Sequence, residues 1–172
     1  MTTRSPDSSG TEMAEKTICA ICRMTAEHLP AVAELERLCF AEPWSEKSLS
    51  MLTVPGGVGF VALSATGEIC GYAGMLTVLD EGQITDIAVL PACRRCGIGG
   101  ALIADLLQFA REAALTEITL EVRVSNEAAI ALYRRAGFLV CGERKNFYRM
   151  PVENAYLMKY TFPADRENLR GV

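Results

Sequence analysis

The stretch that decides the fold is residues 83–110, QITDIAVLPACRRCGIGGALIADLLQFA. The run Gln83 to Leu90 is rich in apolar and β-branched residues, and Pro91 ends it. After a turn, apolar residues recur at the spacing of one helix face: Leu102, Ile103, Leu106, Leu107 and Ala110. The stretch is therefore predicted to fold as a strand, a turn and a helix.

The turn carries Arg94-x-x-Gly97-x-Gly99 directly before the helix. A helix N-terminus leaves backbone N–H groups without partners, and its dipole adds partial positive charge. Glycine lets an anion approach the backbone, and arginine adds forked donors that suit a phosphate. The turn is therefore predicted to bind a pyrophosphate. A glycine-rich turn whose arginines are merely solvated stays an alternative.

Two familiar phosphate loops do not fit this turn. The dinucleotide fingerprint Gly-x-Gly-x-x-Gly requires a third glycine where Leu102 stands, and the Gly-Lys-Ser/Thr of a Walker loop is absent.

Outward from this stretch, strand-like and helical runs alternate. Upstream we predict a strand at Ile18 to Met24, a helix from Pro30 that Pro43 ends, a short helix capped by Ser45, and a hairpin of Gly59 to Leu63 with Ile69 to Leu76. Downstream we predict a strand at Glu117 to Val124, a helix at Asn126 to Ala136 stopped by Gly137, and last strands at Phe138 to Cys141 and Ala155 to Tyr160 with a polar turn region between them.

This order combines hairpins with strand–helix–strand crossovers. It predicts an α/β fold with a mixed, mostly antiparallel sheet of six to seven strands and about four helices on both faces. One domain is expected over residues 17–162. The polar segments 1–16 and 163–172 are expected to be flexible tails.

Composition narrows the class of protein. The net charge of −4 argues against a direct nucleic-acid binder and suits a basic protein partner. The first residues lack the apolar run of a signal peptide, and no apolar run is long enough to span a membrane, so we expect a cytoplasmic protein. The seven cysteines are odd in number and irregularly spaced, which favours reduced thiols over a disulfide framework.

No metal site is expected. Cys19-x-x-Cys22 and Cys93-x-x-Cys96 lie too far apart in the sequence for a zinc ribbon. The only histidine, His28, stands at a helix start and is expected to be a surface or capping residue.

The turn, with residues 85–89 before it, resembles the loop of the GNAT superfamily of N-acetyltransferases. The stretches LEVRVSN (120–126) and ALYRRAGF (131–138) extend the resemblance, which covers about residues 18–160. It implies a GNAT fold with acetyl-CoA as co-substrate. By resemblance, the main chain of residues 87–89 pairs with the pantetheine arm, the turn holds the pyrophosphate, and Asn126 lies near the thioester. The implied acetyl-CoA contacts are Ile87, Ala88, Val89, Arg94, Arg95, Cys96, Gly97, Ile98, Gly99, Gly100 and Asn126. Gly100 departs from the family, where this position is often basic, which leaves Arg94 and Arg95 to compensate.

Three segments resemble the members of this family that acetylate the N-terminal alanine of small-subunit ribosomal protein 18: residues 40–48, residues 120–126, and residues 144–148 followed by 155–158. The resemblance implies a basic ribosomal protein N-terminus as partner, acetylated by direct attack on the thioester, and we expect a monomer or weak dimer. Two alternatives stay open: an acetyltransferase of the same fold acting on lysine side chains, other N-termini or a small amine, and a non-catalytic acetyl-CoA-binding module.

Glu121 and Tyr133 are the candidate base and acid. Glu121 is a carboxylate inside an apolar strand run, although alternation also allows an outward-facing strand glutamate. Tyr133 has a phenol that can protonate a thiolate without ionising at pH 7, although a core tyrosine fits equally. The resemblance assigns the base to Glu121 and the acid to Tyr133. Local pattern alone does not separate Tyr133 from Tyr148 or Tyr156.

Overall fold

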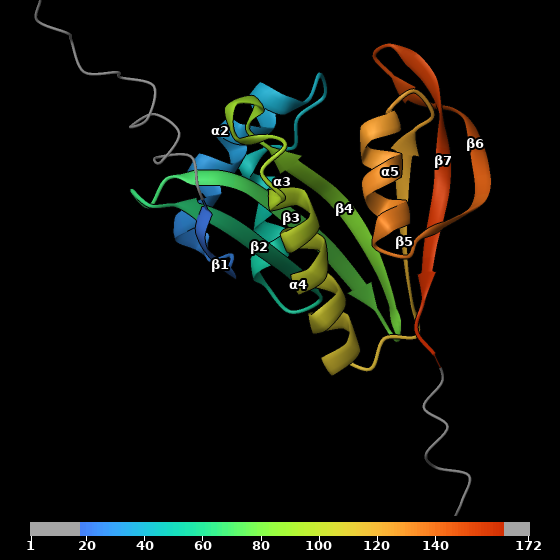
Figure 1. Ribbon diagram of the computed structural model, residues 1–172, viewed down its shortest axis with the longest axis horizontal. Coiled ribbons are helices and arrows are strands. Elements are labelled where there is room, and N and C mark those ends of the chain that lie inside the picture. Colours follow the sequence, from blue (N-terminus) through green and yellow to red (C-terminus); the bar gives the residue numbers. More distant parts are fainter. Residues whose placement is uncertain (1–17, 164–172) are drawn as a thin grey trace, which may run out of the picture.

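The computed structural model describes residues 18–163. They form one seven-stranded sheet in the order β1-β2-β3-β4-β5-β7-β6 (Figure 1). The strands are β1 (Ile18–Arg23), β2 (Gly57–Ser64), β3 (Ile69–Val78), β4 (Glu81–Val89), β5 (Glu117–Arg123), β6 (Leu139–Arg149) and β7 (Val152–Thr161). All neighbours pair antiparallel except β4 and β5, which pair parallel. The predicted mixed, mostly antiparallel sheet is confirmed. The predicted tails lie outside the described residues, apart from Pro163.

Within the described residues the α-helices are α2 (Leu29–Cys39), α3 (Glu46–Leu49), α4 (Ile98–Glu112) and α5 (Glu127–Arg135), with short 3₁₀ turns η1 (Ala26–His28), η2 (Ser50–Thr53) and η3 (Pro91–Cys93). Local signals set several of their ends. The Ser45 side chain caps α3 by accepting the Ser48 N–H at 3.1 Å, as predicted. Gly137, with φ of 100°, follows α5 as predicted. The His28 Nδ1 accepts the Thr25 N–H at 3.0 Å, which confirms a capping role.

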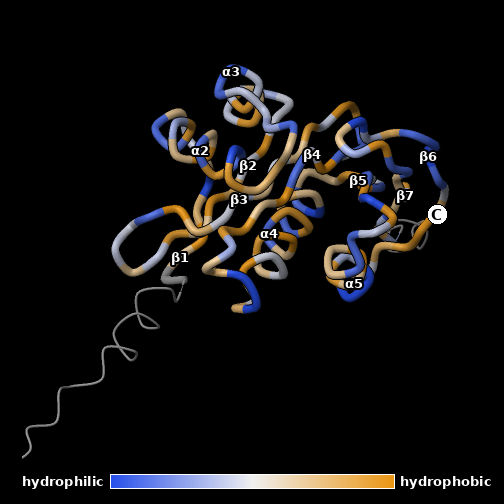
Figure 2. Tube along the Cα trace, turned by 90° about the horizontal axis from the view of Figure 1, so that it is seen from above, coloured by the Kyte–Doolittle hydropathy of each residue, from blue (hydrophilic) through white to orange (hydrophobic). Residues whose placement is uncertain are grey.

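The helices cover both faces of the sheet (Figure 2). The apolar stripe of α4, with Leu102, Ile103 and Leu106, packs with Ile130 and Tyr133 of α5 in one core. The helices α2 and α3 pack in a second core on the other face, together with buried Tyr72 of β3 and Ala88 of β4. Burying an apolar side chain of this size stabilises the fold by roughly 1.5–3 kcal/mol.

The strands β4 and β5 separate soon after they meet. Their parallel ladder holds three residue pairs, Glu81 with Glu117, Gly82 with Ile118 and Gln83 with Thr119. The antiparallel neighbours on either side, β3 and β7, continue to pair along nearly the whole length of β4 and β5. The sheet therefore opens beyond Gln83, as Figure 1 shows. We call this opening the β4–β5 divergence; residues 84–89 and 120–123 border it.

A β-bulge lies at the start of this divergence. On β4, Ile84 pairs with Met75 and Asp86 with Gly74, so Thr85 is the extra residue. A bulge shifts the side-chain alternation of a strand. Ile84 consequently packs in the α4 core, whereas Ala88, four residues later, packs with α2 on the opposite face.

The C-terminal hairpin differs from the prediction. β6 and β7 are long strands that turn near Met150 and Pro151, and the polar turn region predicted between two short strands is wrong. The reason is that β6 is the edge strand and nearly all its side chains are exposed. A strand with both faces exposed to solvent lacks the alternation of apolar and polar residues on which a strand prediction depends.

None of the described helices is long and apolar enough to cross a membrane.

Candidate functional site

The turn before α4 presents a row of free backbone amides. Gly97 is the N-cap residue in the left-handed conformation, with φ of 81°, and Arg95 also has a positive φ of 66°. Within residues 18–163, no main-chain or side-chain acceptor takes the N–H groups from Arg95 to Gly100. These amides lie at the positive end of the α4 dipole. The turn therefore has unpaired amides in an arrangement that suits an anion such as a pyrophosphate.

The two glycines of the motif serve different purposes. A Cβ on Gly97 would meet no atom within 4 Å, so its requirement for glycine comes from the positive φ. A Cβ on Gly99 would lie 3.0 Å from Leu132 Cδ2 of α5, so glycine there lets α5 pack closely. The spacing of the motif thus reflects helix packing as well as anion access.

Arg94 and Arg95 differ in their contacts with the rest of the protein. The Arg94 Nε donates to the Val89 carbonyl at 3.0 Å, which ties the turn to the end of β4. Arg95 is exposed beside the free amides. Arg95 is therefore the arginine that an incoming phosphate meets without first displacing a protein contact.

The predicted cofactor strand, Ile87 to Val89, lies at the β4–β5 divergence. Because β5 no longer pairs with it, the β4 main chain has no strand partner on that side. The Ile87 and Val89 side chains pack against the α4 core, and Ala88 is buried against α2. The backbone edge is thus held in place from both faces while it stays open to a ligand.

Asn126 begins α5 as its cap. Its Oδ1 accepts the Ala129 N–H at 3.1 Å, and no described residue accepts from its Nδ2. The side chain is exposed, so its amide nitrogen is available to a ligand that lies between α4 and α5.

Glu121 lies on β5 at the border of the divergence. Its Oε1 is 3.2 Å from the Arg144 Nε of β6, and its Oε2 accepts from the Gln83 Nε2 at 3.3 Å. The glutamate side chain is only 10% exposed. It faces away from α4, because Leu120 and Val122 on either side of it are buried in the α4 core.

Tyr133 of α5 is a buried ring with an accessible hydroxyl. The ring lies edge-on to Phe138, with centroids 5.9 Å apart. The hydroxyl has no hydrogen-bond partner among residues 18–163. Every buried side-chain oxygen and nitrogen among these residues does have a partner, so the hydroxyl oxygen is not one of the buried atoms. The oxygen atom therefore reaches solvent. Burial, followed by the nearby charge of Asp86, raises the pKa of Tyr133, so the phenol keeps its proton at neutral pH.

Sequence reasoning missed Asp86. Burial, followed by the charge of Glu36, raises the pKa of this carboxyl group on β4 to about 8. A carboxylate among β-branched residues was the available signal, but the face of the strand on which it lies depends on the bulge at Thr85.

Two further tyrosines lie close enough to Asp86 for its charge to raise their pKa beyond the effect of burial. Burial and then the charge of Asp86 raise the pKa of Tyr148 on β6 to about 12, and the Arg123 guanidinium lies 4.1 Å from its ring centroid. The fully buried Tyr72 donates its hydroxyl hydrogen to Oε1 of Glu36, which is itself fully buried on α2. Asp86 thus lies among acidic and phenolic groups.

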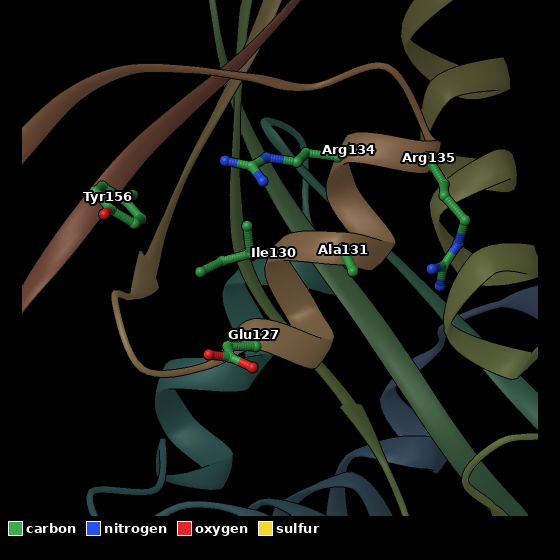
Figure 3. A pocket seen from close by; sticks show the side chains of 6 residues that line it. All are labelled: Glu127, Ile130, Ala131, Arg134, Arg135 and Tyr156. Carbon is green, nitrogen blue, oxygen red and sulfur yellow. The ribbon is translucent and has the colours of Figure 1, made fainter.

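A separate pocket of about 550 Å³ lies beside α5, and Figure 3 shows the side chains that line it. Its lining residues are Glu127, Ile130, Ala131, Arg134, Arg135 and Tyr156. Tyr156 pairs with Val122, whose side chain is buried on the α4 and α5 face, whereas Glu121 faces the opposite side of the sheet. Tyr156, one of the three tyrosines left open as the acid, is therefore separated from Glu121 by the sheet.

Comparison with known proteins agrees with this architecture. The acetyltransferase (GNAT) family model matches residues 29–138. The ribosomal protein bS18-alanine N-acetyltransferase of Escherichia coli strain K12 is 36% identical over 128 residues, which are 74% of this chain and 86% of the relative. The N-alpha-acetyltransferase RimI of Mycobacterium tuberculosis is 36% identical over 149 residues, which are 83% of this chain and 90% of the relative.

A solved structure shows the same fold. The crystal structure of the Escherichia coli ribosomal-protein-S18-alanine N-acetyltransferase matches with a TM-score of 0.80 and 33% identity, over 88% of this chain and 99% of that one. The family model covers more than half of the chain, and the relatives match most of it. The chain therefore belongs to the GNAT family of acetyltransferases.

Proposed function

We propose that this protein transfers the acetyl group of acetyl-CoA to the α-amine at a protein N-terminus, and that the acceptor is the N-terminal alanine of ribosomal protein bS18. One structural observation carries the proposal. The β4–β5 divergence runs from the last strand pair, near which Glu121 stands, to the end of β4, where the amide-lined turn begins. The named activity of the Escherichia coli relative supports the choice of bS18 alanine, and that of the Mycobacterium tuberculosis relative supports an α-amine as acceptor.

The residues present fit acetyl-CoA. The free N–H groups from Arg95 to Gly100 suit its pyrophosphate, and the unpaired edge of β4 suits its amide-bearing pantetheine arm. The Asn126 amide is available near the reacting end.

The reaction balances with the residues at hand. The neutral amine nitrogen attacks the thioester carbonyl carbon, the C–S bond breaks, and an amide forms. Glu121 takes the proton that the amine loses, directly or through one water, and Tyr133 gives a proton to the departing thiolate. The raised pKa of Tyr133 keeps this proton in place until the thiolate forms.

An α-amine is the easier acceptor. Its unperturbed pKa of about 7.7–8.0 leaves roughly a tenth of it neutral at pH 7. A lysine amine near 10.4 needs about 3.4 kcal/mol more to lose its proton. With Glu121 as the base, the site therefore matches an N-terminal amine better than a lysine amine.

Mass spectrometry tests the proposal. The protein is incubated with acetyl-CoA and a peptide that carries the bS18 N-terminus and an internal lysine, and fragment ions locate the acetyl group. We expect it on the α-amine. Acetylation of the lysine alone would support the alternative acyltransferase activity. Binding of acetyl-CoA without release of coenzyme A in the presence of any amine would indicate a non-catalytic module.

A further inference from the structure

Asp86 is a carboxylate without a partner at the β4–β5 divergence. Its side chain is half-buried, and no described residue donates a hydrogen bond to it or forms an ion pair with it. None of the buried side-chain oxygens among the described residues lacks a partner, so the unpaired Asp86 carboxylate is not sealed in the core and is open to a ligand that brings donors.

The bulge at Thr85 decides where Asp86 points. Asp86 pairs with Gly74, and a Cβ on Gly74 would touch Leu52, which belongs to the core beneath α2 and α3. Paired residues share a face of the sheet, so Asp86 faces the α2 and α3 side. Without the extra residue, alternation would turn this carboxylate toward α4.

Glu121 borders the divergence on the same face. Thr119 and Gln83 form the last pair of the ladder, and each carboxylate stands just beyond it, Glu121 on β5 and Asp86 on β4. The charges of both reach Tyr148 of β6, since both raise its pKa after the effect of burial. The two carboxylates therefore flank the same opening.

The two carboxylates differ in their partners. Glu121 already accepts from Arg144 and Gln83. After the effect of burial, the charge of Glu36 on α2 raises the pKa of Asp86, and the charge of Asp86 raises the pKa of Tyr72, Tyr133 and Tyr148, so these acidic or neutral groups lie within electrostatic reach of Asp86. Burial among these groups disfavours the charged form of Asp86. A cation from outside the chain would restore it.

We propose that the Asp86 carboxylate binds the ammonium group of the acceptor, on the face of the sheet that Glu121 shares. This contact selects an acceptor whose amine is unblocked and cationic. The inference rests on the proposed function, because it takes the acceptor to be an amine. A protonated α-amine supplies the missing charge and can donate to both carboxylates. The acetylated product carries no charge, so the same contact no longer holds it.

Asp86→Asn tests the proposal, with Asp105→Asn as a matched control. Asp105 is also a half-buried carboxylate whose pKa burial raises, but it lies within α4. In Asp86→Asn we expect the KM for the peptide to rise about tenfold or more and the Kd for acetyl-CoA to change less than about twofold. Because Asp86 makes no hydrogen bond or ion pair within the described residues, the substitution breaks no such contact, and the Tm should stay level or rise. Asp105→Asn should leave the KM for the peptide unchanged.

A binding assay separates recognition from turnover. A peptide labelled at its C-terminus is titrated into the protein in two forms, with a free and with an acetylated N-terminus. Wild type should bind the free amine about tenfold more tightly, and Asp86→Asn should bind both forms alike. An unchanged preference in Asp86→Asn, or a KM increase that accompanies a fall in Tm and in acetyl-CoA affinity, would overturn the proposal.

The two proposals fail differently. If wild type acetylates lysine rather than the α-amine, the proposed acceptor is wrong, and the Asp86→Asn comparison is made with the lysine peptide and keeps the same expected result. If wild type turns over α-amines and Asp86→Asn matches it in KM, only the role of Asp86 is wrong. If no amine is bound or acetylated, both are wrong.

Discussion

Gln83 of β4 and Thr119 of β5 form the last residue pair before the two strands separate. The two candidate carboxylates of the site are both placed relative to this pair. Glu121 follows Thr119 by two residues on β5, and Asp86 follows Gln83 on β4 with the bulged Thr85 between. The Gln83 side chain also donates to Glu121 at 3.3 Å. The pair therefore both opens the sheet and positions the proposed base.

The left-handed turn at Gly97 should be required for acetyl-CoA binding. Gly97→Ala forces a side chain into a φ of 81°, although there is open space for its Cβ. We expect a stability loss of roughly 1–2 kcal/mol and acetyl-CoA binding weakened about tenfold or more, because relieving the strain redirects the amides that follow. Calorimetric titration with acetyl-CoA measures the affinity.

Gly67→Ala is the matched control for this substitution. Gly67 lies between β2 and β3 with φ of 84°, and a Cβ there also meets no atom within 4 Å. We expect the same stability loss with unchanged affinity for acetyl-CoA. Equal weakening in the two variants would mean that general destabilisation, and not the amide-lined turn, sets the affinity.

Tyr133→Phe should lower the rate without lowering stability. The hydroxyl makes no protein hydrogen bond among the described residues, so its removal should change the free energy of unfolding by less than about 0.5 kcal/mol. The loss of the proton donor should reduce kcat about 100-fold, with acetyl-CoA affinity unchanged. Steady-state kinetics with the accepted peptide measures this. A kcat equal to that of wild type would remove Tyr133 from the mechanism.

Tyr72→Phe, unlike Tyr133→Phe, should lower the stability of the fold. The Tyr72 hydroxyl donates to the fully buried Glu36, whose other oxygen, Oε2, accepts the Trp44 N–H at 2.8 Å. Leaving a buried acceptor without its donor costs roughly 1–3 kcal/mol. Denaturant unfolding of this variant, with Tyr160→Phe as a partly exposed control, measures the loss.

The loss in Tyr72→Phe should grow with pH. Burial raises the pKa of Glu36, so ionisation lowers the stability of the folded state as pH rises from the unfolded value of about 4.3 through the folded value. The Tyr72 hydroxyl counteracts this by favouring the charged form. Its removal should therefore destabilise the protein more at pH 8 than at pH 4. An equal loss at both values would show that Glu36 stays protonated throughout.

Local pattern predicted the parts of the fold and site that depend on neighbours in the chain. The strand, turn and helix around Gly97 follow from residues within about one turn of one another, as do the caps at Ser45 and Gly137. The divergence of β4 and β5 could not be predicted this way, because strand pairing joins segments that are more than thirty residues apart. The contribution of Asp86 depends on a single bulged residue, Thr85, and apolar pattern alone does not reveal a bulge.

Tertiary contacts also separate the three tyrosines that the sequence left equivalent. Tyr156 lines the pocket beside α5, and it packs against the same core as the Tyr133 ring, so the face of the sheet does not distinguish these two. The charge of Asp86 raises the pKa of both Tyr133 and Tyr148, after the effect of burial. Of these two, Tyr133 comes from α5, the helix that packs against Gly99 behind the amide-lined turn, which favours it as the donor to the thiolate.

Glu121→Gln should lower kcat most at acidic pH. An α-amine with a pKa of about 7.7–8.0 is almost wholly protonated at pH 6 and largely neutral at pH 9, so help from a base matters most at the lower value. We expect about a 100-fold loss near pH 6 that shrinks toward pH 9. The matched control is Glu117→Gln, since Glu117 is also on β5 and ion-paired, with its Oε1 2.7 Å from the Lys159 Nζ, but lies at the far end of the strand. That variant should keep the wild-type profile. If the kcat of Glu121→Gln falls by the same factor at every pH, Glu121 positions the substrate through Arg144 and Gln83, and the proton leaves by another route.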